Sequence, residues 1–75
     1  MQLSIIIPTL NEADYIATCV ERANALQPCE LVIVDGGSAD NTVALASDAG
    51  ADVITAPRGR GPQLNAGVAH ATGDV

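Results

Sequence analysis

Three short runs of apolar, largely β-branched residues, each followed by a stretch with helical periodicity, constrain the fold of this chain more than any other feature. The runs are residues 3–7, 30–35 and 51–56. The first two have the length and composition of strands buried in a parallel sheet, and the third is a weaker strand. Because strand and helix alternate, the connections must cross over and return to one sheet. The sequence therefore predicts an α/β fold, a parallel sheet with helices on both faces.

Capping residues and glycines place the three helices. Asn11 is a good N-cap for the first helix, and Asp40 caps a second helix that stops at Gly50. Pro62 suits the first position of the third helix, which Gly73 ends. Asp74-Val75 then resembles the first step of a fourth strand. The apolar positions of the first helix are Ile16, Cys19, Val20, Ala23 and Leu26, and those of the third are Leu64, Val68 and Ala71.

Charge and hydropathy exclude several classes of function. Three basic against nine acidic residues give a net charge of -6, which argues against nucleic acid as a partner, because binding it requires Lys and Arg to neutralise phosphates. The same balance argues against a polybasic membrane-surface module. No apolar run approaches the roughly 18 residues of a transmembrane segment, and the N-terminus lacks the features of a signal peptide. We therefore expect a cytoplasmic protein.

The two cysteines carry no recognisable metal or redox motif. Cys19 and Cys29 are too few for a disulfide scaffold, and no His lies at zinc-ligand spacing. We expect both to be small buried or half-buried apolar residues.

Polar residues follow each strand, at the edge where open parallel sheets bind ligands. They are Thr9, Asn11 and Glu12, then Asp35 to Ser38, then Arg58 to Gly61. Asp35 precedes two glycines, so its carboxylate can accept a hydrogen bond from a ribose hydroxyl or a base N–H. It can equally satisfy the amides of its own turn, and the residues leave both interpretations open. Glu12 is also explained by favourable charge in the first turn of a helix.

The loop of residues 58–61 holds two of the three basic side chains. Arg60 in an otherwise acidic chain favours recognition of a diphosphate, helped by the amides at the start of the third helix. Arg58 fits a ligand contact and a solvated loop equally well. Asn65 can face the same ligand or the solvent, and His70 suits the C-terminal end of its helix.

Two familiar nucleotide sites are excluded at the residue level. Residues 8–12 lack the Gly-x-Gly-x-x-Gly of dinucleotide-binding folds, and a chain without Lys cannot form a P-loop. An AdoMet-dependent methyltransferase is a weaker alternative, since Asp35-Gly36-Gly37-Ser38 follows the second strand rather than the first. A non-catalytic nucleotide-binding piece or truncated remnant is the other alternative.

Ordered segments of the chain resemble the N-terminal half of family 2 glycosyltransferases of the GT-A fold. They are residues 4–12 (SIIIPTLNE), 32–42 (VIVDGGSADNT), 59–67 (GRGPQLNAG) and 71–74 (ATGD). The resemblance implies a Rossmann-like sheet, and the Asp-Gly-Gly-Ser variant is closest to a small bacterial, cytosolic branch. It also implies transfer of a sugar from a nucleotide-diphosphate donor to an acceptor hydroxyl, with inversion. The residues 1–75 would then be one partial domain of an apparently truncated fold.

The resemblance implies a binding role for one set of residues, with a UDP-linked donor favoured. The set is Pro8, Thr9, Asn11, Glu12, Asp35, Gly36, Gly37, Arg60 and Asn65. By this resemblance Asp35 contacts the base with the help of Glu12, and Arg60 and Asn65 lie near the diphosphate. Asp35 does not distinguish uracil from guanine, so both bases stay open.

The same resemblance implies chemistry that these residues do not carry. Mg²⁺ or Mn²⁺ stabilises the departing diphosphate in the family, but its Asp-x-Asp motif follows the fourth strand and the general base lies further on. We expect no catalytic residue and no metal ligand here, and little or no transfer by this chain alone. In the family's sheet the fourth strand pairs with the first. Residues 3–7 would then be an exposed apolar edge that favours self-association.

Overall fold

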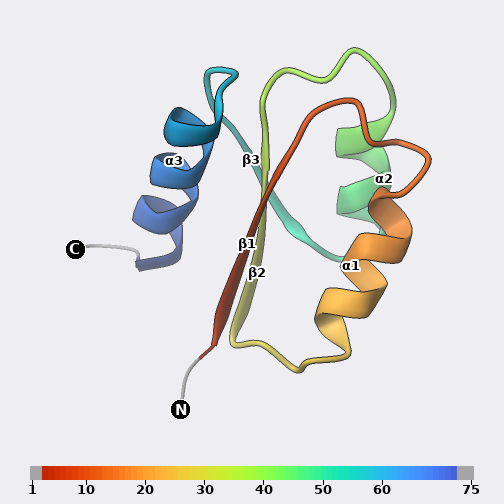
Figure 1. Cartoon of the computed structure of the whole chain (residues 1–75). Coiled ribbons are helices and arrows are strands. Elements are labelled where there is room, and N and C mark those ends of the chain that lie inside the picture. Colours follow the sequence, from red (N-terminus) through yellow and green to blue (C-terminus); the bar gives the residue numbers. More distant parts are fainter. Residues whose placement is uncertain (1–2, 73–75) are drawn as a thin grey trace.

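The computed structural model describes residues 3–72 and places six elements in that part of the chain. In order they are β1 (Ser4–Thr9), α1 (Ile16–Asn24), β2 (Glu30–Asp35), α2 (Thr42–Asp48), β3 (Asp52–Thr55) and α3 (Arg60–Thr72). The strand order is β1-β2-β3 and both pairings are parallel. The alternating α/β architecture predicted from the sequence is confirmed (Figure 1).

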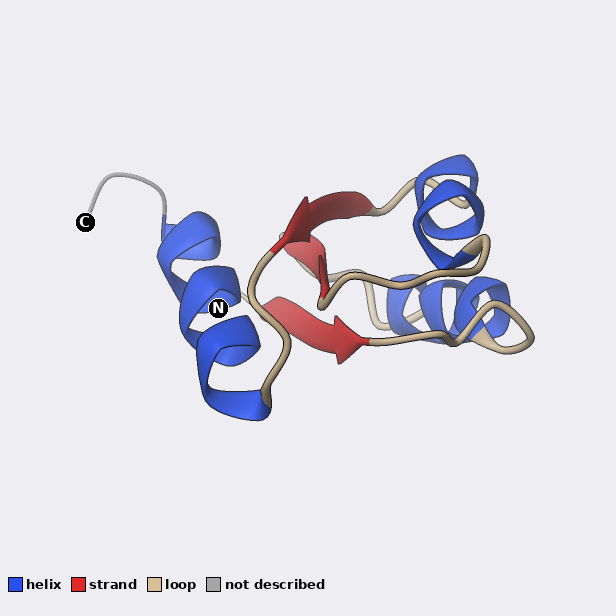
Figure 2. Ribbon diagram, turned by 90° about the horizontal axis from the view of Figure 1, so that it is seen from above, coloured by secondary structure: helices blue, strands red, loops and turns tan. Residues whose placement is uncertain are grey.

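Three layers are visible when the molecule is viewed from above (Figure 2). The helices α1 and α2 cover one face of the sheet, and α3 covers the other, as predicted. No helix within residues 3–72 is long and apolar enough to cross a lipid bilayer. The predicted helix end at Gly73 and the predicted strand start at residues 74–75 lie outside the described residues.

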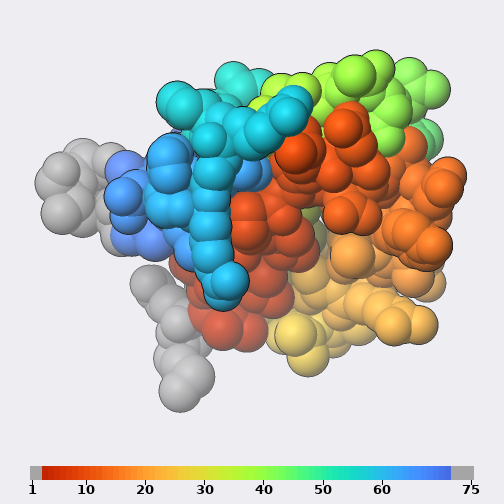
Figure 3. Space-filling model, turned by 45° about the horizontal axis from the view of Figure 1, so that its top comes forward, coloured from red at the N-terminus to blue at the C-terminus, as the bar shows by residue number. Residues whose placement is uncertain are grey.

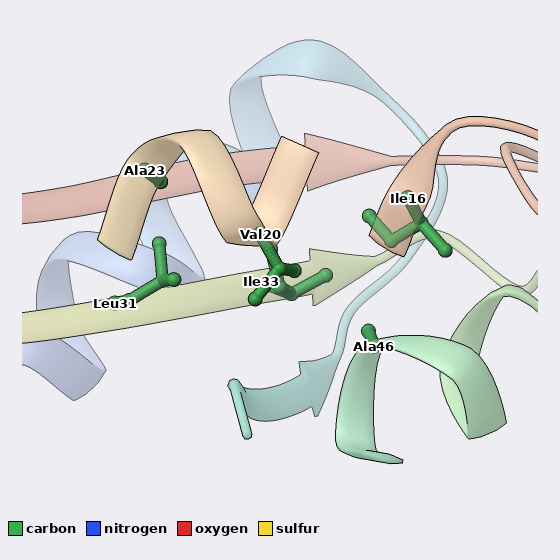
Figure 4. Close-up of a cluster of buried hydrophobic side chains, with 6 residues drawn as sticks. All are labelled: Ile16, Val20, Ala23, Leu31, Ile33 and Ala46. Carbon is green, nitrogen blue, oxygen red and sulfur yellow. The ribbon is translucent and has the colours of Figure 1, made fainter. Parts of the chain in front are cut away.

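The core lies between β2 and the α1–α2 layer (Figure 4). Its buried members are Ile16, Val20, Ala23, Leu31, Ile33 and Ala46. Strand side chains alternate between the two faces of a sheet, and Ile33 pairs in register with Ile7 on one side and Val53 on the other. Full burial of one such aliphatic side chain contributes about 1.5–3 kcal/mol, so this row anchors the sheet.

The first helix buries a narrower stripe than the sequence predicts. Ile16, Val20 and Ala23 are buried, because the spacing of four and three residues keeps them on one line over the sheet. Cys19 falls at the margin of that line and is exposed, and Cys29 is exposed as well. The prediction that both cysteines are buried or half-buried is therefore wrong. Leu26 lies beyond the helix end and is 66% exposed.

The first helix also begins later than predicted. Asn11 has a left-handed backbone, with φ of 53°, and the helix starts at Ile16. The backbone N–H groups of Tyr15 and Ile16 both donate to the carbonyl of Glu12, so a turn precedes the helix. Asn11 is therefore not its N-cap, and its side chain is free to bind another loop.

The strand β1 continues through Pro8 to Thr9, beyond the predicted end at residue 7. Leu3 O accepts a hydrogen bond from Cys29 N, and Thr9 O accepts one from Gly36 N. Odd-numbered residues of β1 thus direct their backbone groups toward β2. The N–H that proline lacks would lie on the opposite edge, so Pro8 costs the sheet no bond to β2.

The third helix begins at Arg60, so only the first part of the predicted loop at 58–61 is loop. Pro62 is the third helical residue rather than the first. Its missing N–H is still one of the four that have no partner inside a helix.

The third helix contacts the sheet through a polar and a small residue rather than through the predicted apolar stripe. Gln63 is 6% exposed and Gly67 is buried, whereas Val68 is 52% exposed. Leu64 and Ala71, also predicted on the buried face, are half-buried. The buried face therefore lies one residue earlier along the helix than the apolar pattern indicates.

Candidate functional site

The loops that follow the three strands gather at one edge of the sheet, the top edge in Figure 1. Figure 3 shows the cyan and blue surface of the β3–α3 loop and the start of α3 beside the red and orange surface at the end of β1. A cleft of about 420 Å³ lies there. Its lining residues are Pro8, Thr9, Leu10, Arg60, Gln63 and Leu64. Three of the predicted site residues, Pro8, Thr9 and Arg60, are thus brought together from distant parts of the sequence.

The cleft brings an exposed cation to the end of β1. Arg60 is exposed at the first turn of α3, where the helix dipole also favours negative charge. The cleft therefore suits an anionic ligand. Thr9 also lines the cleft, but its Oγ1 is buried and has no hydrogen-bond partner in the described structure. Such an unpaired buried polar atom costs about 1–3 kcal/mol.

Asp35 ends β2 and is only 2% exposed. Its Oδ2 accepts hydrogen bonds from Gly37 N at 2.9 Å and Ser38 N at 2.8 Å, and its Oδ1 accepts one from the Ser38 hydroxyl. The sequence left two roles open for Asp35, contact with a ligand and bonding of the amides of its own turn. In this structure its carboxylate bonds the turn amides. Asp35 is not among the residues that line the cleft.

Asn11 joins the loop after β1 to the loop after β2. Its backbone N–H donates to Ser38 Oγ, and its Oδ1 accepts from Ala39 N, both at 2.8 Å. The next residue, Glu12, donates its backbone N–H to Thr42 Oγ1 at 2.8 Å, while its side chain is exposed. We call this set of contacts the loop latch. Both predicted ligand residues thus use backbone or amide groups to hold the two loops together.

Asp40 completes the loop latch. Its Oδ1 accepts hydrogen bonds from the Thr42 backbone N–H at 3.0 Å and from the Thr42 hydroxyl, and its Oδ2 accepts one from Ala13 N at 3.2 Å. The Thr42 hydroxyl, supported by the N–H groups of Thr42 and Ala13, holds the pKa of Asp40 below its ordinary value of 3.8, against a smaller effect of burial. The N-cap position of α2 is occupied by Asn41, so the predicted N-cap, Asp40, lies one residue too early. Its carboxylate still bonds the first residue of the helix, Thr42, and binds the first loop as well.

The remaining predicted site residues, Gly36, Gly37 and Asn65, do not line the cleft. Gly36 is buried against the side chain of Gln63, and Gly37 has a φ of 93°, which glycine adopts readily. Asn65 is exposed on α3 and does not line the cleft. The structure thus does not bring Asn65 to the other predicted residues.

Gln63 is the cleft residue that sequence reasoning misses, together with the apolar neighbours Leu10 and Leu64. Its spacing of four residues from Gly67 places both on one helix face. A polar residue and a glycine at that spacing are the signal that could have identified it.

No group of three or more His, Cys, Asp or Glu side chains in the described part of the chain is arranged to hold a metal ion. Outside the cleft, His70 Nε2 lies 2.6 Å from Asp52 Oδ2 and links α3 to the start of β3. The side chains of this pair are 39% and 58% exposed, so the contact is a surface link rather than part of the site.

The sequence matches known proteins along its whole length. The family model described as glycosyl transferase family 2 matches residues 4–75. An uncharacterized glycosyltransferase from a Nostoc species is 36% identical over 84 aligned residues, which cover 100% of this chain and 26% of that protein. A PGL/p-HBAD biosynthesis glycosyltransferase from Mycobacterium tuberculosis is 51% identical over 47 residues, or 59% of this chain and 18% of that protein. The chain thus spans about a quarter or less of the length of these relatives.

The fold also matches solved structures. Glucosyl-3-phosphoglycerate synthase from Mycobacterium tuberculosis superposes with a TM-score of 0.83 at 27% identity, over 92% of this chain and 30% of that one. The same synthase in complex with Mn²⁺, UDP and glucosyl-3-phosphoglycerate superposes with a TM-score of 0.76 at 28% identity, over 84% of this chain and 27% of that one.

Proposed function

Because this chain belongs to glycosyl transferase family 2, we propose that it forms the donor-nucleotide half-site of an enzyme that transfers a sugar from a nucleoside diphosphate to an acceptor. The observation that carries this proposal is the cleft that the exposed Arg60 lines together with Pro8 and Thr9 at the end of β1. Its volume of about 420 Å³ falls within the range of small-molecule sites, about 300–1,000 Å³. The similar synthase bound to UDP supports a uridine nucleotide as the donor.

The site residues take two kinds of role in this proposal. Pro8, Thr9 and Arg60 contact the donor, and Arg60 forms charge-assisted hydrogen bonds with the diphosphate. Asn11, Glu12, Asp35, Gly36 and Gly37 frame the site through the loop latch and the β2 turn. The Oδ1 of Asp35 accepts a single hydrogen bond and retains the capacity for one from a base N–H. Because the residue is only 2% exposed, such a contact requires the β2 turn to move. The exposed Asn65 contacts only a part of the donor that projects beyond the cleft.

The complete reaction requires groups that residues 3–72 do not supply. The related synthase holds Mn²⁺ together with UDP, and we propose Mg²⁺ or Mn²⁺ for the whole enzyme. The metal acts there as a Lewis acid on the departing diphosphate. The described residues form no cluster for it. Because the chain spans about a quarter of the length of its relatives, we propose that residues 1–75 are one partial domain of the enzyme. We expect little or no transfer by this chain alone.

Titration of the chain with UDP, GDP and AdoMet, each with and without Mn²⁺, tests the proposal by isothermal calorimetry. We expect UDP or GDP to bind. Arg60→Ala removes charge-assisted bonds worth about 1.5–3 kcal/mol and should raise the Kd by about 10- to 100-fold. The matched control is Arg22→Ala, an exposed Arg on α1 across the sheet, which should leave the Kd unchanged. Binding of AdoMet without binding of UDP or GDP contradicts the proposal.

Self-association of the isolated chain is a second part of the proposal. The strand β1 is the outer strand of the described sheet, and its even-numbered residues direct backbone groups away from β2. Such an edge can pair with a second copy. Light scattering during size exclusion should show mass rising with concentration, and a concentration-independent monomer with a sharp thermal transition contradicts the expectation. The cytoplasmic location is likewise a proposal, which fractionation of the source cells tests.

A further inference from the structure

We propose that Gln63 is a positioning residue whose amide fixes the shape of the donor cleft by bonding the ends of β1 and β2 and the start of α3 to one another. The choice of UDP as the ligand in the second experiment rests on the proposed function. The first experiment concerns the cleft alone and does not depend on it.

Gln63 makes three hydrogen bonds to the backbone of three separate segments. Its Nε2 donates to Thr9 O at 3.1 Å and to Val34 O at 2.9 Å. Its Oε1 accepts from Gly59 N at 3.1 Å. An amide has two N–H donors, so both are used, and the carbonyl oxygen is used as well. One buried side chain therefore bonds the end of β1, the end of β2 and the loop before α3.

Gly36, which follows β2, lies directly against the side-chain amide of Gln63. A Cβ added at Gly36 would lie 2.8 Å from Gln63 Oε1 and 2.9 Å from its Cδ. The absence of a side chain at Gly36 therefore provides the space that the amide occupies. This contact explains why a glycine occupies position 36, which its place after Asp35 does not reveal.

Gln63 itself and one of the residues that it bonds, Thr9, line the cleft. Gln63 bonds directly to the backbone of Thr9, and it lies three residues, about one helical turn, after Arg60. The position of the Arg60 turn relative to Thr9 therefore depends on the length and donors of one side chain. An apolar residue of the same size would leave two buried carbonyl groups and the half-buried N–H of Gly59 without this partner. A carboxylate would place oxygen against two carbonyl oxygens.

The first experiment compares amide hydrogen exchange in the chain with Gln63→Met, which keeps the length and loses the hydrogen bonds. We expect exchange at Gly36, Gly59 and Leu64 to accelerate by about tenfold more than exchange at Ile33 and Ala46, because local opening leaves the distant core closed. The control Val20→Ala, a cavity in that core, should accelerate the core amides more than the cleft amides. Where Gln63→Met does not fold, Gln63→Asn, which keeps the amide but shortens its reach, should give the same local pattern. Equal acceleration in both regions, or no change at the cleft, overturns the inference.

The second experiment is a double-mutant cycle on the Kd for UDP. Gln63→Met should raise the Kd by about tenfold in the native background and by less than about twofold with Arg60→Ala present, since a positioning residue acts through the group that it positions. Equal factors in the two backgrounds would assign Gln63 a structural role only. Failure of the native chain to bind UDP contradicts the proposed donor, and the exchange pattern still decides the role of Gln63.

Discussion

A Cβ added at Gly67 would lie 2.3 Å from Cγ2 of Ile6, so α3 approaches β1 at a distance that only glycine permits. The same atom would lie 2.9 Å from Cγ2 of Val34. Glycine is a poor helix former, so its presence within α3 is explained by this contact. The close approach also brings the amide of Gln63, one turn earlier, within reach of the strand ends.

Gly67→Ala should therefore destabilise the chain by about 1–3 kcal/mol, the usual cost of adding a methyl group where packing leaves no space. Both Ile6 and Val34 belong to strands, so neither can retreat without moving the sheet. Urea unfolding followed by far-ultraviolet circular dichroism measures the change. The matched control is Gly61→Ala on the same helix, whose added Cβ meets nothing within 4 Å. That control adds only the local restriction on a helical residue before proline and should cost less than Gly67→Ala, so equal losses for both variants would contradict the contact.

Asp40 should make the stability of the chain depend on acid pH. Its folded-state pKa is lowered from 3.8, chiefly by the Thr42 hydroxyl, so its stabilising contribution is complete above the unfolded value. It is lost as the pH falls from 3.8 through the lower folded value. Asp40→Asn should therefore reduce stability near neutral pH, and the stability of this variant should fall less steeply than that of the native chain as the pH drops below 3.8. Urea midpoints measured across that range test this.

The control for Asp40 is Asp48→Asn, the same chemical change at the other end of α2. It removes no contact of the loop latch, so the acid part of the stability curve should keep its slope. A native slope in Asp40→Asn would show that its hydrogen bonds do not favour the charged form.

The strand pattern predicts the sheet closely because backbone pairing and burial depend on local residue type. Residues 30–35 form β2 as expected, with all members from Leu31 to Asp35 buried. The edge strand is less predictable. A proline ends a strand only where a neighbouring strand needs the N–H that proline lacks. Which edge of β1 is paired depends on the whole sheet, so the local sequence does not show that Pro8 is tolerated.

The site is less predictable than the sheet because its geometry depends on contacts between residues far apart in the sequence. Asn is a residue type favoured at helix N-caps. The side chain of Asn11 instead bonds Ala39, 28 residues later in the sequence, and its backbone is left-handed. Gln63 bonds Thr9 across 54 residues, and the glycine four residues later is the one local sign that separates it from an exposed helical Gln. Of the residues predicted to bind a nucleotide, Pro8, Thr9 and Arg60 line the cleft, since all lie at carboxyl ends of strands or just beyond them.

Asn11 offers a pair of variants that separate its side chain from its backbone. Asn11→Gly removes the bond from Ala39 N to Oδ1 but keeps a residue that adopts φ of 53° readily. Asn11→Ala removes the same bond and adds a left-handed backbone cost of about 1–2 kcal/mol. We expect both to destabilise, with Ala worse than Gly by about 1 kcal/mol in urea unfolding. Equal losses would mean that the backbone at this position relaxes once the loop latch opens.

Thr9→Val should separate ligand binding from stability. The Thr9 Oγ1 is buried without a partner in the described residues, so replacing the hydroxyl by a methyl group should leave the stability of the free chain unchanged or raise it by about 1 kcal/mol. A donor that uses this hydroxyl should bind about 2- to 10-fold more weakly, the equivalent of one neutral hydrogen bond. Thr42→Val is the matched control, because Thr42 is fully buried and its hydroxyl both donates to Asp40 and accepts from Glu12 N. That control should destabilise by about 1–3 kcal/mol. If Thr9→Val costs as much stability as Thr42→Val, the Thr9 hydroxyl already has a partner within the protein and is not reserved for the donor.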